Sequence, residues 1–155
     1  MNLPALLPPE RVACNLAVNS KKRALEHLGQ LLAPGVPELR AESVFDCLLA
    51  RERLGSTGLG RGVAIPHGRL DGIEAARIAV VKLENGIDFD AVDGRPVDLM
   101  FGLLVPAAAT EEHLNLLAIL AELLSDDRFV AELRRADSAP DLYQLLQSRT
   151  RQLAA

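Results

Sequence analysis

The chain has 155 residues, of which 49% are hydrophobic, and its 17 basic and 21 acidic side chains give a formal charge of -4 at pH 7. These values are typical of one domain with a buried core, and the scattered Lys and Arg disfavour a nucleic-acid-binding surface. The longest strongly apolar stretches, 97–105 and 114–124, are shorter than the roughly 20 residues of a membrane-spanning helix, which disfavours membrane insertion. Cys14 and Cys47 lack the spacing of a redox pair and follow no export signal, so we expect free thiols in a cytoplasmic protein.

Predicted strands and helices alternate through the first two thirds of the chain. Alternating apolar residues predict a strand at 12–18, and apolar residues at helical spacing predict helices at 21–32 and 41–53. Two interior strands are predicted at 77–83 and 97–105, because both segments are apolar and the first is rich in β-branched residues.

Two shorter strands complete the predicted sheet. One is expected at 63–65, just before His67. The other is expected at 87–90, entering a turn at Asp93-Gly94, so part of the sheet should be antiparallel.

The last third of the chain predicts three helices, each opened by a capping side chain. Thr110 should cap a helix over 111–124, and Asp126 or Asp127 should open a shorter one that ends near Ala136. A last helix, capped by Ser138, should contain Asp141 to Gln147.

We therefore predict a three-layer α/β domain over 1–155, with a mixed parallel and antiparallel sheet and helices on both faces. In this prediction residues 1–11 are a short Pro-rich N-terminal extension and residues 148–155 are a polar tail. Ligand sites in such folds gather at strand ends, which is where we expect His67 and the loop at 105–110.

The run Gly58-Leu-Gly-Arg-Gly-Val-Ala-Ile-Pro-His67-Gly68-Arg69 places a single imidazole among glycines. Glycine lets the backbone approach a ligand closely, and Pro66 biases the residue before it toward an extended conformation. An imidazole in this setting can accept a group covalently, and phosphate is the natural candidate because loop amides such as that of Gly68 and nearby guanidinium groups neutralise it. The spacing alone leaves equally open a loop histidine bonded to a backbone carbonyl.

Other polar residues are candidates for the same site, each with a simpler alternative. His113 follows Thr110 in the first turn of a predicted helix, where it is either a second site histidine or a residue of the capping turn. Arg51 lies near the C-terminal end of the helix predicted at 41–53 and is either a guanidinium aimed at phosphate oxygens or a solvated arginine on the helix dipole. Ser56 and Thr57 offer hydroxyl donors to phosphate, or they are ordinary loop residues.

Three familiar kinds of site do not fit the sequence. The glycine-rich loop follows a helix and lacks the Gly-Lys-Ser/Thr of a nucleotide-binding loop. His67 and His113 have no paired histidine or cysteine at metal-ligand spacing, and no Gly-x-Ser-x-Gly elbow is present. We expect neither a cofactor nor a metal ion.

The string from Arg51 to Arg69, Arg-Glu-Arg-Leu-Gly-Ser-Thr-Gly-Leu-Gly-Arg-Gly-Val-Ala-Ile-Pro-His-Gly-Arg, closely resembles the signature of enzyme IIA domains of the mannitol/fructose class in the bacterial sugar phosphotransferase system. Segments at 20–26, 89–99 and 103–106, and the Glu-His-Leu at 112–114, extend the resemblance. Together they are similar to the nitrogen-regulatory branch of that class and cover nearly the whole chain.

By matching position, the resemblance implies that His67 is the phosphorylated histidine, His113 the second active-site histidine and Arg51 the active-site arginine. It implies a phosphotransferase that accepts a phosphoryl group from the phosphohistidine of an HPr-like carrier and whose phosphorylation state regulates partner proteins, such as kinases or potassium transport systems. Two alternatives stay open: a IIA phosphocarrier that feeds a separate fructose- or mannitol-type sugar permease, and an interaction module that is never phosphorylated. The attacking ring nitrogen of His67 is also left open.

Overall fold

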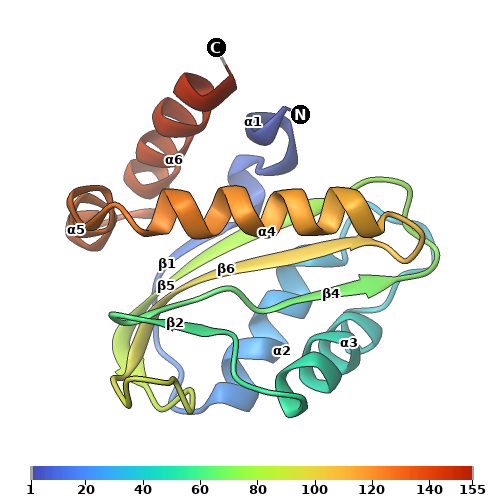
Figure 1. The fold of residues 1–155 in the computed structure, drawn as a ribbon, viewed down its shortest axis with the longest axis horizontal. Coiled ribbons are helices and arrows are strands. Elements are labelled where there is room, and N and C mark those ends of the chain that lie inside the picture. The colour runs from blue at the N-terminus through green and yellow to red at the C-terminus, as the bar shows by residue number, and fades with distance from the viewer. Residues whose placement is uncertain (1, 155) are drawn as a thin grey trace.

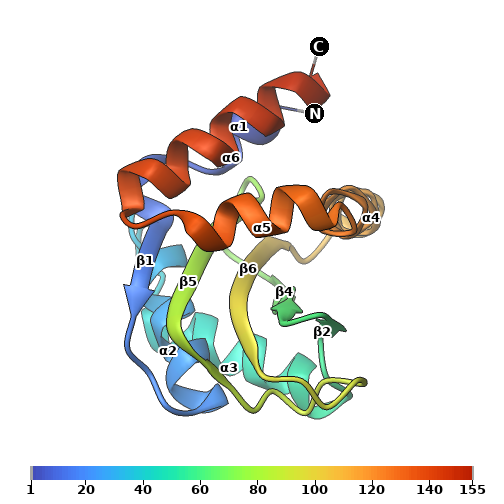
Figure 2. The same ribbon diagram turned by 90° about the vertical axis from the view of Figure 1, so that its left-hand side faces the viewer.

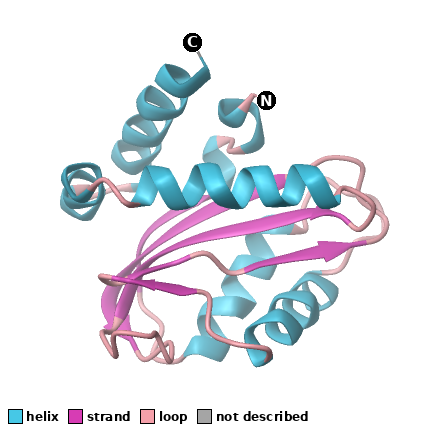
Figure 3. Ribbon diagram, viewed as in Figure 1, coloured by secondary structure: helices cyan, strands magenta, loops and turns pink. Residues whose placement is uncertain are grey.

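The computed structural model describes residues 2–154 and places a mixed β-sheet between two layers of helices (Figures 1, 2 and 3). The strands described are β1 (Val12–Leu16), β2 (Gly58–Gly60), β3 (Val63–Ala64), β4 (His67–Leu70), β5 (Arg77–Ile87) and β6 (Val97–Pro106). The helices described are α1 (Leu3–Leu6), the short 3-10 helix η1 (Pro9–Arg11), α2 (Lys21–Leu32), α3 (Ala41–Arg53), α4 (Thr110–Leu124), α5 (Asp127–Arg135) and α6 (Ala139–Ala154). This arrangement confirms the predicted three-layer α/β fold. None of the described helices is long and apolar enough to cross a bilayer.

The sheet has the strand order β1-β5-β6-β3-β2, and β4 also pairs with β6. β6 is antiparallel to β5 and parallel to both β3 and β4, with His67 opposite Leu103. Pro66 separates the two short strands because it has no N–H to donate to a ladder. Its carbonyl still accepts from the Leu103 N–H at 2.9 Å. His67 therefore opens a strand of its own, which the sequence did not predict, on the same side of β6 as β3.

Each face of the sheet has its own apolar core. α2 and α3 cover one face, where Leu28 and Leu48 are fully buried, whereas α4, α5 and α6 cover the other, where Leu116 and Leu146 are fully buried (Figure 2). Burying such a side chain stabilises the fold by about 1.5–3 kcal/mol. The bounds predicted for α2 and α3 are confirmed, and the buried apolar residues of both helices belong to the same core.

The predicted strand at 87–90 is wrong. β5 continues to Ile87, which pairs with Val97 of β6, and the chain turns at Asp90, whose φ is +54°. The Asp90 N–H donates to the Asp88 carboxylate at 3.0 Å, which stabilises the turn. The antiparallel pairing expected in this region is present, but it joins β5 to β6.

Side chains cap two of the last three helices as predicted. Asp126 accepts from two N–H groups at the start of α5, and the Ser138 hydroxyl accepts from the Asp141 N–H at 3.2 Å at the start of α6. The expected cap of α4 is wrong, because Thr110 is itself the first helical residue and Ala109 precedes it without a side-chain hydrogen bond.

The N-terminal segment is folded onto α6 (Figures 1 and 2). Leu3 and Leu7 are buried, and the Gln147 side-chain amide donates to the carbonyls of Pro4 at 3.3 Å and Leu7 at 3.0 Å. The buried Arg11 guanidinium continues the attachment, since its Nε donates to the Ile78 carbonyl at 3.0 Å.

The polar tail predicted over 148–155 is wrong as far as the described residues reach. α6 continues to Ala154, and residue 155 lies outside the described part of the chain. Thr150 is buried, and its hydroxyl donates to the Leu146 carbonyl at 2.8 Å within the helix. The side of the helix that carries this threonine therefore stays buried beyond the point where polar composition suggested an end.

Candidate functional site

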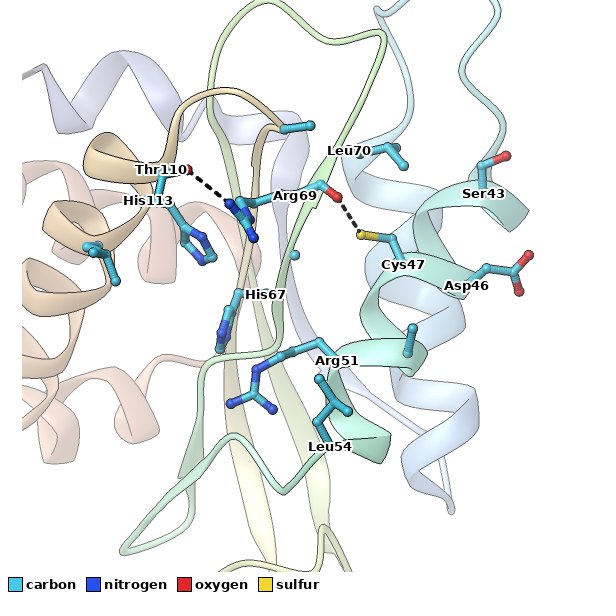
Figure 4. A pocket seen from close by; sticks show the side chains of 14 residues that line it. Ser43, Asp46, Cys47, Arg51, Leu54, His67, Arg69, Leu70, Thr110 and His113 are labelled. Atoms are coloured by element: carbon cyan, nitrogen blue, oxygen red, sulfur yellow. Dashed lines mark hydrogen bonds between the residues drawn. The ribbon is translucent and has the colours of Figure 1, made fainter.

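A cleft with a volume of about 1010 Å³ opens at the edge of the sheet where the three layers meet, between α3, β4 and the start of α4 (Figure 4). Its lining residues are Ser43, Asp46, Cys47, Ala50, Arg51, Leu54, His67, Gly68, Arg69, Leu70, Ala107, Thr110, His113 and Leu114. The structure thus brings four of the predicted site residues together from segments far apart in the sequence: Arg51, His67, Gly68 and His113.

His67 is half-buried at the start of β4, and its Nδ1 lies 2.7 Å from the Ile65 carbonyl oxygen. A carbonyl only accepts, so Nδ1 carries the proton of the neutral ring and Nε2 keeps a lone pair. Burial lowers the pKa of His67 below its ordinary value, and the charge of Arg51 lowers it further, while the Ile65 bond opposes the shift. The ring is therefore neutral at pH 7, and the lone pair on Nε2 is chemically able to attack an electrophile.

The ring of His113 lies beside that of His67, with centroids 5.3 Å apart and planes at 61° (Figure 4). Burial lowers the pKa of His113, and the nearby charges of His67, Arg69 and Arg51 act in the same direction. The Nε2 of His113 is buried and has no hydrogen-bond partner within residues 2–154. A buried polar atom without a partner is costly, so a ligand that bonds to it would be favoured.

Two guanidinium groups flank the imidazoles. Arg51, in the last turn of α3, donates to the Gly55 carbonyl at 2.8 Å and lines the cleft. Arg69 donates to the Thr110 hydroxyl at 3.0 Å, which connects β4 to the start of α4. Arg69 was not among the predicted site residues, although strand alternation could have found it: residues 67 and 69 lie on the same face of a strand.

Gly68 faces away from this cluster and packs under α3. A Cβ at this position would lie 2.5 Å from the Cys47 sulfur, so a side chain here would collide with the helix. The Cys47 thiol also donates to the Arg69 carbonyl at 3.3 Å. Gly68 lines the cleft, but close packing of α3 on β4 already explains why it is a glycine.

Ser56 and Thr57, expected to bind phosphate, do not line the cleft. The Ser56 hydroxyl donates to the Phe89 carbonyl at 2.8 Å. Thr57 is buried, and its hydroxyl and N–H donate to the two carboxylate oxygens of Glu52 at 2.5 and 2.8 Å. Both hydroxyl groups are thus committed within the protein, because the turn after α3 folds back over Glu52.

The glycine-rich loop is also explained by packing. Gly62 has a φ of +81°, which favours glycine, and a Cβ there would contact the Arg134 guanidinium. That guanidinium pairs with the Asp98 carboxylate at 3.0 Å and donates to the Arg61 carbonyl at 2.6 Å. Gly62 therefore allows a close contact with Arg134 of α5, and not the close approach to a ligand that we expected of this part of the loop.

Comparisons with known proteins agree with this architecture. Residues 5–149 match the family model described as "Phosphoenolpyruvate-dependent sugar phosphotransferase system, EIIA 2". A protein named nitrogen regulatory protein from Pseudomonas aeruginosa is 49% identical over 146 residues, which are 94% of this chain and 95% of that protein. A fructose-specific EIIA component from Haloferax volcanii is 32% identical over 145 residues, 94% of each chain. The crystal structure of nitrogen regulatory protein IIA-Ntr from Neisseria meningitidis has a TM-score of 0.87 at 44% identity, covering 93% of this chain and 98% of that one.

Proposed function

The chain belongs to the EIIA type-2 family of the phosphoenolpyruvate-dependent sugar phosphotransferase system, a family of phosphotransfer components, and on this premise we propose that His67 carries the transferred phosphoryl group. The observation that supports the proposal most directly is the state of the imidazole. Its Nδ1 is bonded to a backbone carbonyl, and its Nε2 is left to react at a cleft that holds a second imidazole and two guanidinium groups.

The proposed reaction is an in-line transfer between two imidazoles. Nε2 of His67 attacks the phosphorus of a donor phosphohistidine, the new P–N bond forms as the donor's P–N bond breaks, and the donor ring leaves with the electron pair. The His67 ring gains positive character as it loses its lone pair to phosphorus. Its Nδ1 proton then makes a charge-assisted hydrogen bond to the Ile65 carbonyl, which is stronger in the transition state than before attack.

The phosphoryl oxygens need donors, and the cleft supplies them. His113, with its Nε2 unpartnered among the described residues, is proposed to donate a hydrogen bond from that atom to a phosphoryl oxygen. Arg51 and Arg69, which lie on opposite sides of His67 in Figure 4, offset the negative charge. Because the donor phosphate arrives already activated, catalysis is placement and charge stabilisation, without a separate base.

The proposed donor is an HPr-like phosphocarrier protein, and the proposed output is regulation of partner proteins in the cytoplasm by the phosphorylation state of His67. The nitrogen regulatory names of relatives at 42–49% identity favour this reading. The fructose-specific relative at 32% identity supports the second candidate, a carrier that passes phosphate to a sugar permease.

The test is phosphorylation by phosphoenolpyruvate, enzyme I and an HPr-like carrier, with His67→Ala beside the wild type and His27→Ala as the control for a histidine outside the cleft. We expect an acid-labile, base-stable label on wild type and His27→Ala and none on His67→Ala. Label retained in His67→Ala would move the acceptor to another residue. An unlabelled wild type would leave the interaction module as the function.

A further inference from the structure

A buried carboxylate next to Arg51, that of Glu52, does not line the cleft. The Glu52 side chain is 1% exposed, and its oxygens accept from the Lys21 ammonium at 3.0 Å and from the Thr57 hydroxyl and N–H at 2.5 and 2.8 Å. We call Lys21, Glu52 and Thr57 the Glu52 cluster. Burying an ion pair is weak as a source of stability, because desolvation of the charges offsets their attraction. A contribution to stability therefore does not explain why these charges are buried.

Three segments that are distant in sequence meet at the Glu52 cluster. Lys21 is the first residue of α2, and Glu52 lies near the end of α3. The Lys21 ammonium also donates to the Phe89 carbonyl at 3.3 Å and lies 4.8 Å from the centre of the Phe89 ring, in the turn after β5. These segments belong to three of the five strings that carry the sequence resemblance, and their shared contact is a carboxylate that the proposed phosphoryl transfer does not use.

Backbone hydrogen bonds connect the Glu52 cluster to His67. The Thr57 carbonyl accepts from the Ile65 N–H at 3.1 Å, and the Ile65 carbonyl lies 2.7 Å from Nδ1 of His67. Thr57 is thus fixed by Glu52 through its N–H and hydroxyl, and it fixes Ile65 through its carbonyl. Both peptide groups of this path are in the β2–β3 hairpin or directly beside it.

The same turn also places the arginine. The Gly55 N–H donates to the Glu52 carbonyl at 3.2 Å, and the Gly55 carbonyl accepts from the Arg51 guanidinium at 2.8 Å. The turn that Glu52 closes through Thr57 therefore contains the acceptor of Arg51. A displacement of this turn would move the guanidinium and the carbonyl partner of His67 together.

We propose that the Glu52 cluster is a positioning device for the nucleophile: it holds the Ile65 carbonyl on Nδ1 of His67, and so fixes the tautomer that leaves Nε2 free to react. Lys21, Glu52 and Thr57 are positioning residues in this proposal and do not touch the phosphoryl group. The consequence for transfer rests on His67 being the acceptor, whereas the consequence for the tautomer does not.

The test measures the tautomer and the transfer rate separately. In the unphosphorylated protein, ¹⁵N NMR of the His67 ring distinguishes a protonated from an unprotonated Nδ1. The variants are Glu52→Gln, Lys21→Met and Thr57→Val, each checked for folding by circular dichroism. Matched controls are Lys22→Met, which removes the neighbouring exposed lysine of α2, and Glu42→Gln, which removes an exposed charge of α3. Thr57→Ser keeps the hydroxyl and serves as the rescue.

We expect the Nδ1-protonated form of His67 to predominate in the wild type, both controls and Thr57→Ser, and to lose population in Glu52→Gln, Lys21→Met and Thr57→Val. Phosphoryl transfer per folded molecule should slow about tenfold or more in the same three variants, because small misplacements of a nucleophile are costly. Folded cluster variants with the wild-type tautomer and wild-type rate would overturn the proposal.

If Glu52→Gln does not fold, the comparison of Thr57→Val with Thr57→Ser decides, because valine removes the hydroxyl that contacts Glu52 and serine keeps it. The two proposals also fail separately. A wild type that is never labelled overturns the assignment of His67 as acceptor, while the NMR comparison still supports or overturns the positioning role.

Discussion

The two histidines of the cleft are held in opposite ways. His67 begins a strand, and its Nδ1 is bonded to a carbonyl two residues back. His113 lies in the first turn of a helix, and its Nε2 is buried without a partner within the described residues. The comparison teaches that a ring whose tautomer is fixed suits a nucleophile, whereas a ring with an unused donor suits an incoming oxygen.

Removing the second imidazole should have the largest effect on this comparison. In His113→Ala we expect phosphoryl transfer to His67 to slow by about 10²-fold, because a preorganised donor to the phosphoryl oxygens is lost. Carrier binding should be retained. Rapid-quench transfer kinetics and a carrier-binding titration measure the two quantities. Wild-type kinetics would mean that His113 takes no part in the transfer and is only a residue of the first turn of α4.

The packing of α3 on β4, the strand that begins with His67, can be disrupted at Gly68. In Gly68→Ala the new Cβ would lie 2.5 Å from the Cys47 sulfur, and such overpacking costs about 1–3 kcal/mol of unfolding free energy. Urea unfolding measures the loss. The double variant Gly68→Ala/Cys47→Ala should recover most of it relative to Cys47→Ala alone, and additive losses would show that the two residues do not collide.

Acid should lower the free energy of unfolding through both histidines. The pKa values of His67 and His113 are lowered in the folded protein, chiefly by burial. The unfolded chain therefore binds more protons below the ordinary histidine pKa of about 6.5, and stability is lost as the pH falls from there toward the folded values. Urea unfolding between pH 7.5 and 5 should show a shallower loss in His67→Gln/His113→Gln than in the wild type. Equal slopes would place the acid sensitivity elsewhere.

The smallest effect is expected where the two histidine segments touch. Thr110→Val removes the hydroxyl that accepts from Arg69, an exposed contact worth about 1 kcal/mol or less. Transfer should stay close to the wild-type rate. A large loss of stability in urea unfolding would contradict the small contribution expected of this contact.

Long periodic segments could be predicted from the sequence, and short irregular ones could not. α2 and α3 have a full apolar face, and their predicted bounds are those of the structure. β2 and β4 were missed because strands of three and four residues, rich in glycine and arginine, carry no alternation of apolar residues. The tail was misjudged because a helix with a buried threonine has the same composition as a polar end.

The residues of the candidate site could be predicted where the type of side chain indicates its chemistry. His67, His113 and Arg51 do line one cleft, while their roles stay predictions. The prediction that Thr57 binds phosphate is not supported, because its hydroxyl donates to Glu52. A hydroxyl next to a glycine in the sequence resembles a ligand-binding group, and only the conformation of the turn after α3 shows which way it faces. Contacts of that kind depend on how the backbone turns, which neither spacing nor composition specifies.

The attachment of the N-terminal segment to α6 bears on how the chain could be rearranged. The Gln147 amide holds the carbonyls of residues 4 and 7, so the described ends at residues 2 and 154 lie on neighbouring elements (Figures 1 and 2). A short linker between them, with new ends opened in the largely exposed connection at 34–38, gives a circular permutant that leaves every strand and the cleft uncut.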